Sequence, residues 1–247
     1  MKTALIIPDC HIPYEDKRAY DLMLKVGKSM KIDEVVILGD YADFYAINSH
    51  GKHPAKQQTL MDEVIIVIER LQQLRRSFPK AKIVFIEGNH EHRLARYIQN
   101  RCPDMYGVTS TDKILELSRF RIKFIPYGPG QQYPVLESDL KARHEPLAGG
   151  KHVAQNTAEK AMCSVIFGHT HRLQEAQTVS LDGKNYRGIS SGWLGDSASP
   201  VFDYVKSHYQ WAQGFSITRV FPDGSFHNRL VHIIDYKCIV NGKLFKG

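Results

Sequence analysis

The chain has 247 residues, of which 43% are hydrophobic and 24% are charged, as in ordinary soluble globular proteins with a well-buried domain. No apolar run approaches the roughly 20 residues that cross a bilayer, so we expect no membrane partner. The formal net charge of +7 fits an anionic partner or substrate, but it specifies no chemistry.

The cysteines and the first residues indicate the compartment. Four cysteines lie far apart and form no C-x-x-C pair: Cys10, Cys102, Cys163 and Cys238. This usage predicts reduced thiols and excludes a disulfide framework. The first apolar run extends only from Ala4 to Ile7 and has no small-residue cleavage site after it, which argues against a signal peptide. We therefore predict a cytoplasmic protein.

Three early segments are continuous β-branched runs that end in polar residues, as strands buried on both faces do: 3–9, 34–40 and 82–89. Between them, residues 18–30 and 60–78 place apolar side chains three and four positions apart, which predicts helices. This alternation predicts a largely parallel sheet with right-handed crossovers. Ligands bind beyond the carboxyl ends of such strands, where Asp9, Asp40 and Asn89 lie.

The rest of the chain predicts further elements. Helices are expected at 93–100 and 152–162, and strands at 121–127, 139–145 and 164–167. Two hairpins are expected to turn at Asp182-Gly183 and Asp223-Gly224. We predict one α/β domain spanning residues 1–247, with two sheets packed face to face and helices outside.

Side chains that bind metals follow the predicted strands. They are Asp9, His11, Asp40, Asn89, His144, His169 and His171. Imidazoles and carboxylates suit borderline divalent metals such as Mn, Fe, Zn, Ni or Co, and the lack of thiolates argues against a structural zinc site. Seven side chains can fill two sites only if one is shared, and a carboxylate is the natural bridge.

The charge of such a centre favours phosphate. Two divalent ions, two carboxylates and a bridging hydroxide leave a formal charge of about +1, which attracts an anionic phosphoryl oxygen. A centre richer in carboxylates would repel that substrate. The residue types therefore predict phosphoryl chemistry.

The pattern D-x-H, G-D-x-x-D, G-N-H-E, H, G-H-x-H between Asp9 and His171 resembles that of the calcineurin-like metallophosphoesterases. The resemblance implies a four-layer α/β/β/α sandwich of two mixed sheets and a dinuclear centre, with Mn as the favoured metal. One ion would be held by Asp9, His11, Asp40 and His171. The other would be held by Asp40, Asn89, His144 and His169, with Asp40 bridging. His152 is the alternative to His144.

The same resemblance implies roles beside the metals. A shared water would attack the phosphorus in line, and His90 would assist departure of the leaving group as a general acid or charge stabiliser. Asp43 would orient His90 and keep it protonated. Arg93 is a candidate contact to the substrate phosphate.

The substrate is less closely defined. Phosphoprotein phosphatases of this superfamily typically carry Arg-Gly directly after G-D-x-x-D, where this chain has Phe44-Tyr45. We expect a phosphodiester or phosphomonoester of a nucleotide or nucleic acid, with Tyr41, Phe44 and Tyr45 available to stack a base. A phosphoprotein phosphatase and a non-catalytic protein-binding scaffold are the alternatives. Contacts of His50, His53 or Trp193 with substrate, and a homo-oligomer, are left open.

Overall fold

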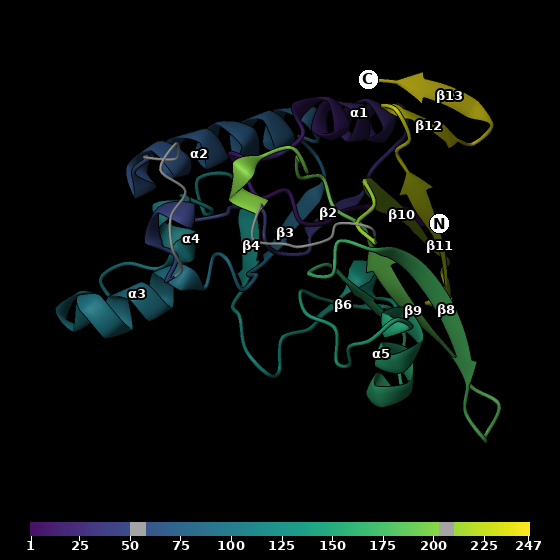
Figure 1. Ribbon diagram of the computed structural model, residues 1–247. Helices are drawn as coiled ribbons and strands as arrows, with labels where there is room; N and C mark the ends of the chain where they lie inside the picture. Colours follow the sequence, from purple (N-terminus) through teal and green to yellow (C-terminus); the bar gives the residue numbers. More distant parts are fainter. Residues whose placement is uncertain (50–57, 203–209) are drawn as a thin grey trace.

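The computed structural model describes residues 1–49, 58–202 and 210–247. His50 and His53 lie outside the described residues. Two mixed sheets face each other, with helices on both outer sides (Figure 1). The predicted α/β sandwich of two mixed sheets is confirmed.

The first sheet has six strands in the order β11-β10-β1-β2-β3-β4. Its parallel part consists of β1 (Lys2–Ile7), β2 (Glu34–Ile37), β3 (Lys82–Ile86) and β4 (Ile122–Ile125). The hairpin of β10 (Gly214–Val220) and β11 (Phe226–His232) extends the sheet in antiparallel fashion beside β1. The carboxyl ends of four parallel strands therefore share one edge.

The second sheet has five strands in the order β5-β6-β7-β9-β8. They are β5 (Tyr133–Pro134), β6 (Lys141–Arg143), β7 (Val165–Phe167), β8 (Leu173–Val179) and β9 (Asn185–Ser191). β6 and β7 are parallel, and so are β7 and β9, whereas β5 and β8 pair antiparallel with their neighbours. Both predicted hairpins are present, with Gly183 and Gly224 at positive φ in their turns.

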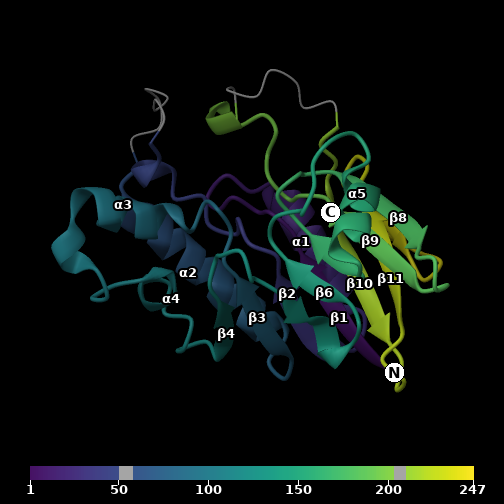
Figure 2. The same ribbon diagram turned by 90° about the horizontal axis from the view of Figure 1, so that it is seen from below.

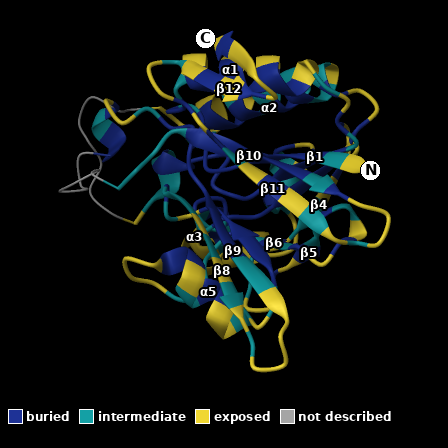
Figure 3. Ribbon diagram, turned by 90° about the vertical axis from the view of Figure 1, so that its right-hand side faces the viewer, coloured by how far each residue is buried: buried dark blue, intermediate teal, exposed yellow. Residues whose placement is uncertain are grey.

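Alternation along the strands separates the two main core layers. On β1, Leu5 and Ile7 pack toward the helices, whereas Ala4 and Ile6 pack toward the second sheet. The central strands β2, β3 and β7 are accordingly buried almost throughout, whereas β8 and β11 at the sheet edges carry exposed residues (Figure 3). The fully apolar runs in the sequence reflect this burial on both faces.

The helices cover the outer faces. α1 (Lys17–Lys28) and α2 (Leu60–Ser77) pack on the first sheet, and α5 (Val153–Ala161) packs on the second. α3 (Arg93–Arg101) and the short α4 (Thr111–Ile114) follow β3, and α3 lies well away from the β8–β9 hairpin (Figure 2). Among the helices within the described ranges, none is both long and apolar enough to cross a bilayer.

One hairpin was not predicted. β12 (Lys237–Val240) and β13 (Lys243–Lys246) form a separate two-stranded sheet against α1. Its turn is Asn241-Gly242, and both residues have positive φ. Asn-Gly is the preferred sequence for such a two-residue turn, so the sequence does contain the signal.

Candidate metal centre

The seven predicted ligands come together at the carboxyl ends of β1, β2, β3, β6 and β7. Two clusters have donor atoms that all lie within 4.8 Å of one another: Asp9, His11 and His171 in one, and Asp40, His144 and His169 in the other. Asn89 joins the second cluster, because its Oδ1 lies 2.8 Å from His144 Nε2 and 2.9 Å from His169 Nδ1. The first cluster holds three of the four ligands predicted for one site, without Asp40, and the second cluster with Asn89 holds the four predicted for the other.

A third cluster connects the other two. It contains His11, Asp40 and His90, again with donor atoms within 4.8 Å. His90 Nε2 lies 3.8 Å from Asp40 Oδ2, so the imidazole predicted to act on the leaving group borders both clusters. His152 is exposed at the start of α5 and belongs to no such cluster among the described residues.

The first cluster presents nitrogen lone pairs to one point. His11 Nε2 lies 3.0 Å from His171 Nε2, and His171 Nε2 lies 3.8 Å from Asp9 Oδ1. The other ring nitrogen of His11 lies 2.9 Å from Asp43 Oδ2. A carboxylate on Nδ1 leaves Nε2 as the ligand atom, which is the usual arrangement behind a metal-binding histidine.

The second cluster is arranged in the same way. His144 Nδ1 is within 2.8 Å of the Leu38 carbonyl, so its Nε2 faces Asn89 and lies 3.3 Å from Asp40 Oδ1. His169 offers Nδ1, and its backbone N–H donates to both carboxylate oxygens of Asp9 at 2.8 and 3.0 Å. Residues from both sheets are thereby joined at the centre.

The motif glycines are required by close approach. A Cβ on Gly88 would lie 2.2 Å from Asp40 Oδ1, and a Cβ on Gly168 would lie 2.4 Å from Asp9 Oδ2. Ordinary contact begins at about 3.4 Å, so any side chain at either position would displace a candidate ligand. The glycines of G-N-H-E and G-H-x-H therefore make room for the carboxylates.

The backbone is strained where it carries the ligands. His11, Asp40, His169 and His171 all have φ between 47° and 63°. Non-glycine residues in this region cost of order 1–3 kcal/mol each, and such strain concentrates at functional sites. Glu91, which sequence reasoning missed, supports one of these turns: its buried carboxylate accepts hydrogen bonds from the backbone N–H groups of Asp40, Ala42 and Gly88 at 2.7–2.9 Å.

The protonation states suit metal binding. Burial lowers the pKa of His11, His169 and His171, so these imidazoles are held in the neutral, ligating form. Burial raises the pKa of Asp9 to about 7, because nothing nearby compensates its charge fully. Burial alone would lower the pKa of His144, but Asp40 raises it to about 10. A cation between these groups would replace the proton that the raised pKa holds on His144, and it would keep Asp9 ionised. The donor set therefore fits a divalent metal.

Asp43 links His90 to its surroundings. Asp43 Oδ2 lies 3.1 Å from His90 Nδ1, besides its contact with His11, and Asp43 Oδ1 accepts from Arg93 Nη1 at 3.0 Å. Arg93 Nη2 also lies 3.0 Å from His90 Nε2. Arg93, predicted to contact substrate, is thus tied to Asp43 and His90, a connection that sequence reasoning did not anticipate.

The aromatic residues do not lie as predicted. Tyr41 and Phe44 are fully buried, with the Tyr41 hydroxyl 2.7 Å from that of Tyr20, and Tyr45 is buried in a separate cluster against Tyr14. The prediction that Tyr41, Phe44 and Tyr45 stack a nucleobase is therefore wrong. The loop after β2 carries the Tyr41 and Phe44 rings back into the core against the helices, and Phe44 has a left-handed φ of 52° in that loop.

Tryptophans enclose the first cluster. Trp193 is buried and stacks on the His171 ring, with centroids 4.8 Å apart and planes at 15°. Trp211 meets the same imidazole edge-on at 4.2 Å. These contacts fix the orientation of His171, so Trp193 serves as a wall of the centre. Cys10, between Asp9 and His11 in the sequence, is buried in the core on the helix side of the first sheet.

Comparisons with known proteins show what the chain is similar to. The chain is 23% identical over 260 residues to Gene 54 protein of Mycobacterium phage L5, covering 99% of each chain. Among solved structures, Vps29 of Chaetomium thermophilum aligns at a TM-score of 0.47 and 12% identity, covering 95% of this chain and 87% of that one. The phosphoesterase Yfce of E. coli aligns at a TM-score of 0.39 and 16% identity, covering 92% and 98%.

A family comparison covers most of the chain. Residues 2–173 match the calcineurin-like phosphoesterases, and this range includes every cluster described above. The family predicted from the sequence motifs is therefore confirmed. The chain belongs to the calcineurin-like phosphoesterase family.

Proposed function

We propose that the chain hydrolyses phosphoester bonds at a centre of two divalent metal ions. The observation that carries the proposal is the pair of donor clusters, joined through Asp40 and flanked by His90. One ion would be held by Asp9, His11, Asp40 and His171, and the other by Asp40, Asn89, His144 and His169. When bound, the ions would acidify a water and neutralise the phosphoryl oxygens.

His90 is proposed as the proton donor to the leaving-group oxygen. Burial alone would lower the pKa of His90, but Asp40 and Asp43 raise it above its ordinary value, which favours the protonated imidazole that an acid needs. Asp43 holds Nδ1, so Nε2 is the atom that delivers the proton. Asp43 is therefore proposed to orient His90.

Arg93 is proposed to bind the phosphoryl group. Its Nη1 donates to the backbone and side-chain oxygens of Asp43 at 2.9 and 3.0 Å, which anchors the guanidinium. Its Nη2 cannot donate to a protonated His90 Nε2, and this group is then available to a phosphoryl oxygen. Substrate would in this way replace the contact between Arg93 and His90.

The experiment is hydrolysis of bis-p-nitrophenyl phosphate and p-nitrophenyl phosphate with Mn²⁺. We expect turnover in the wild type and none in Asp40→Asn. His90→Ala should lower turnover by about 10²–10⁴-fold while metal content stays at the wild-type value. A loss of bound metal in His90→Ala would instead make His90 a ligand. No turnover of either ester with any divalent metal would favour the non-catalytic scaffold, and preference between the esters separates diesterase from monoesterase.

The finer assignments are proposals as well. We favour Mn²⁺ as the metal, a nucleotide or nucleic acid as the substrate, and residues 1–247 as a single domain. Phe44 and Tyr45 stand where phosphoprotein phosphatases of the superfamily typically carry Arg-Gly, so dephosphorylation of proteins is the weaker candidate. All four cysteines are free thiols, which supports the prediction of a cytoplasmic location.

A further inference from the structure

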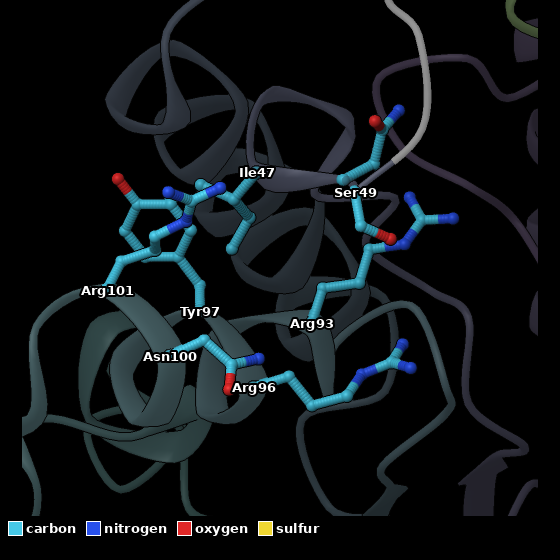
Figure 4. A pocket seen from close by; sticks show the side chains of 8 residues that line it. Ile47, Ser49, Arg93, Arg96, Tyr97, Asn100 and Arg101 are labelled. Carbon is cyan, nitrogen blue, oxygen red and sulfur yellow. The ribbon is translucent and has the colours of Figure 1, made fainter.

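A basic pocket lies beside the centre, along α3. It has a volume of about 510 Å³ and is lined by Ile47, Asn48, Ser49, Arg93, Arg96, Tyr97, Asn100 and Arg101 (Figure 4). We call it the α3 pocket. Arg93 belongs both to this pocket and to the network of Asp43 and His90, and Arg96 Nη2 lies 3.4 Å from the Asn89 carbonyl. The pocket therefore begins at the catalytic centre.

The charge of the α3 pocket selects an anion. Three of its lining residues are arginines, and none of the described residues lining it is acidic. Arg93 is paired with Asp43, whereas Arg96 and Arg101 form no ion pair within the part of the chain that the structure describes. Both are exposed, so their guanidinium groups are accessible to phosphate.

The spacing of the arginines selects a ligand with several phosphates. Arg93 and Arg101 are eight residues apart on α3, which places them about 12 Å apart along the helix axis. With the guanidinium groups at opposite ends of the pocket, one phosphate does not contact both (Figure 4). A nucleic acid strand places its charges roughly 3.4 Å or more apart along its axis, so this distance corresponds to about three nucleotides. Figure 4 shows Arg93 and Arg96 toward one end of the pocket and Arg101 toward the other.

An aromatic ring completes the site. Tyr97 lies between Arg96 and Arg101 in the lining and is 42% exposed, in contrast to the buried Tyr41 and Phe44. An accessible ring beside guanidinium groups is the combination that binds unpaired bases and backbone in single strands.

We propose that the α3 pocket binds the backbone of a single-stranded nucleic acid whose scissile phosphoester lies at the metal centre. The inference rests on the proposed function, because it extends the substrate from the reacting phosphate along α3. Arg96 and Arg101 contact neighbouring phosphates, and Tyr97 stacks on a base. The metal centre performs the hydrolysis, and the pocket selects a strand over a small ester.

The test compares three substrates: bis-p-nitrophenyl phosphate, thymidine 5′-(p-nitrophenyl phosphate) and a 12-nucleotide oligothymidylate. The variant is Arg96→Gln/Arg101→Gln. Its control is Arg119→Gln/Arg121→Gln, two exposed arginines shortly before β4, at the opposite end of the parallel strands, of which Arg119 pairs with Glu116. We expect the α3 variant to lower kcat/KM for the oligonucleotide by about tenfold or more and to leave the small ester unchanged.

The salt dependence of kcat/KM and substitutions at Tyr97 provide two independent tests of strand binding. The slope of log(kcat/KM) against log salt for the oligonucleotide should weaken by about 1.4, since each single-strand phosphate contact contributes about 0.7. Tyr97→Ala should lower oligonucleotide turnover, and Tyr97→Phe should retain it.

Each outcome separates the pocket from the reaction. If the α3 variant matches its control on the oligonucleotide while the small ester is cleaved, the pocket proposal is overturned and the proposed function stands. If the α3 variant lost kcat/KM equally for the thymidine ester and the oligonucleotide, the proposal of a strand would be overturned in favour of a single nucleotide as the ligand. If the wild type cleaves no ester, fluorescence anisotropy with a labelled oligothymidylate compares the affinities of the variant and its control. Equal affinities would overturn the pocket proposal.

Discussion

Gly168→Ala tests whether Asp9 must occupy its observed position. A Cβ at residue 168 would lie 2.4 Å from Asp9 Oδ2 and 3.2 Å from Asp9 Cγ, whereas ordinary contact begins at about 3.4 Å. Asp9 is fully buried, and both its oxygens accept from the His169 N–H, so the carboxylate has no free direction in which to turn. It must move by about 1 Å, a misplacement that can cost about 10²-fold in turnover.

The assay is Mn²⁺-dependent hydrolysis of bis-p-nitrophenyl phosphate, with metal content measured on the same samples. We expect Gly168→Ala to lose turnover and part of its metal while it still unfolds cooperatively. Gly149→Ala is the control, because a Cβ there meets nothing within 4 Å. Wild-type turnover and metal content in Gly168→Ala would refute the reasoning that Asp9 binds metal in the observed geometry.

Three further predictions concern charge. Asp43→Asn should lower turnover by about 10²-fold, since the amide lacks the negative charge that favours protonated His90 and cannot accept from Arg93 while its one oxygen faces His11 and His90; unchanged kinetics would remove Asp43 from its positioning role. Burial raises the pKa of Glu63 from 4.5 to about 7, so the folded state retains a proton that the unfolded chain releases. Stability should therefore fall by up to about 3 kcal/mol as pH rises through that window, and urea unfolding of Glu63→Gln should lack this slope; parallel curves for the two proteins would show that Glu63 stays ionised. Mn²⁺ at about 100 times its Kd should raise Tm by roughly 5–10 °C, and Asp40→Asn should lose most of this shift in a thermal melt.

Much of the centre could be predicted because it depends on strand direction. In a parallel sheet, residues just beyond consecutive strands share one edge, which is why Asp9, Asp40 and Asn89 could be grouped before any coordinates. His169 and His171 follow the strand predicted at 164–167, and both lie with left-handed φ in the turns after β7. The sequence indicates the edge at which they lie but not this backbone conformation.

The contacts between loops could not be predicted in this way. Nothing in the sequence shows that Asp43 meets His11 and Arg93 as well as His90, since these contacts depend on how three loops pack. The prediction that the aromatic residues stack a base was wrong for a related reason. Polar neighbours made Tyr41 and Phe44 look like a loop surface, but the loop turns back into the core, and the exposed ring is Tyr97 on the following helix.

Asp43 therefore contacts more residues than the one histidine that it was predicted to orient. Its carboxylate contacts His11 of the first cluster, the proposed acid His90 and Arg93 of the α3 pocket. One substitution at Asp43 is expected to disturb the proposed metal binding, proton donation and substrate contact together, so it cannot assign the effect to any one of them. Arg96 and Arg101 lack this connection to the carboxylate, because their guanidinium groups form no ion pair with it. They are the positions at which recognition of a long substrate can be separated from the chemistry.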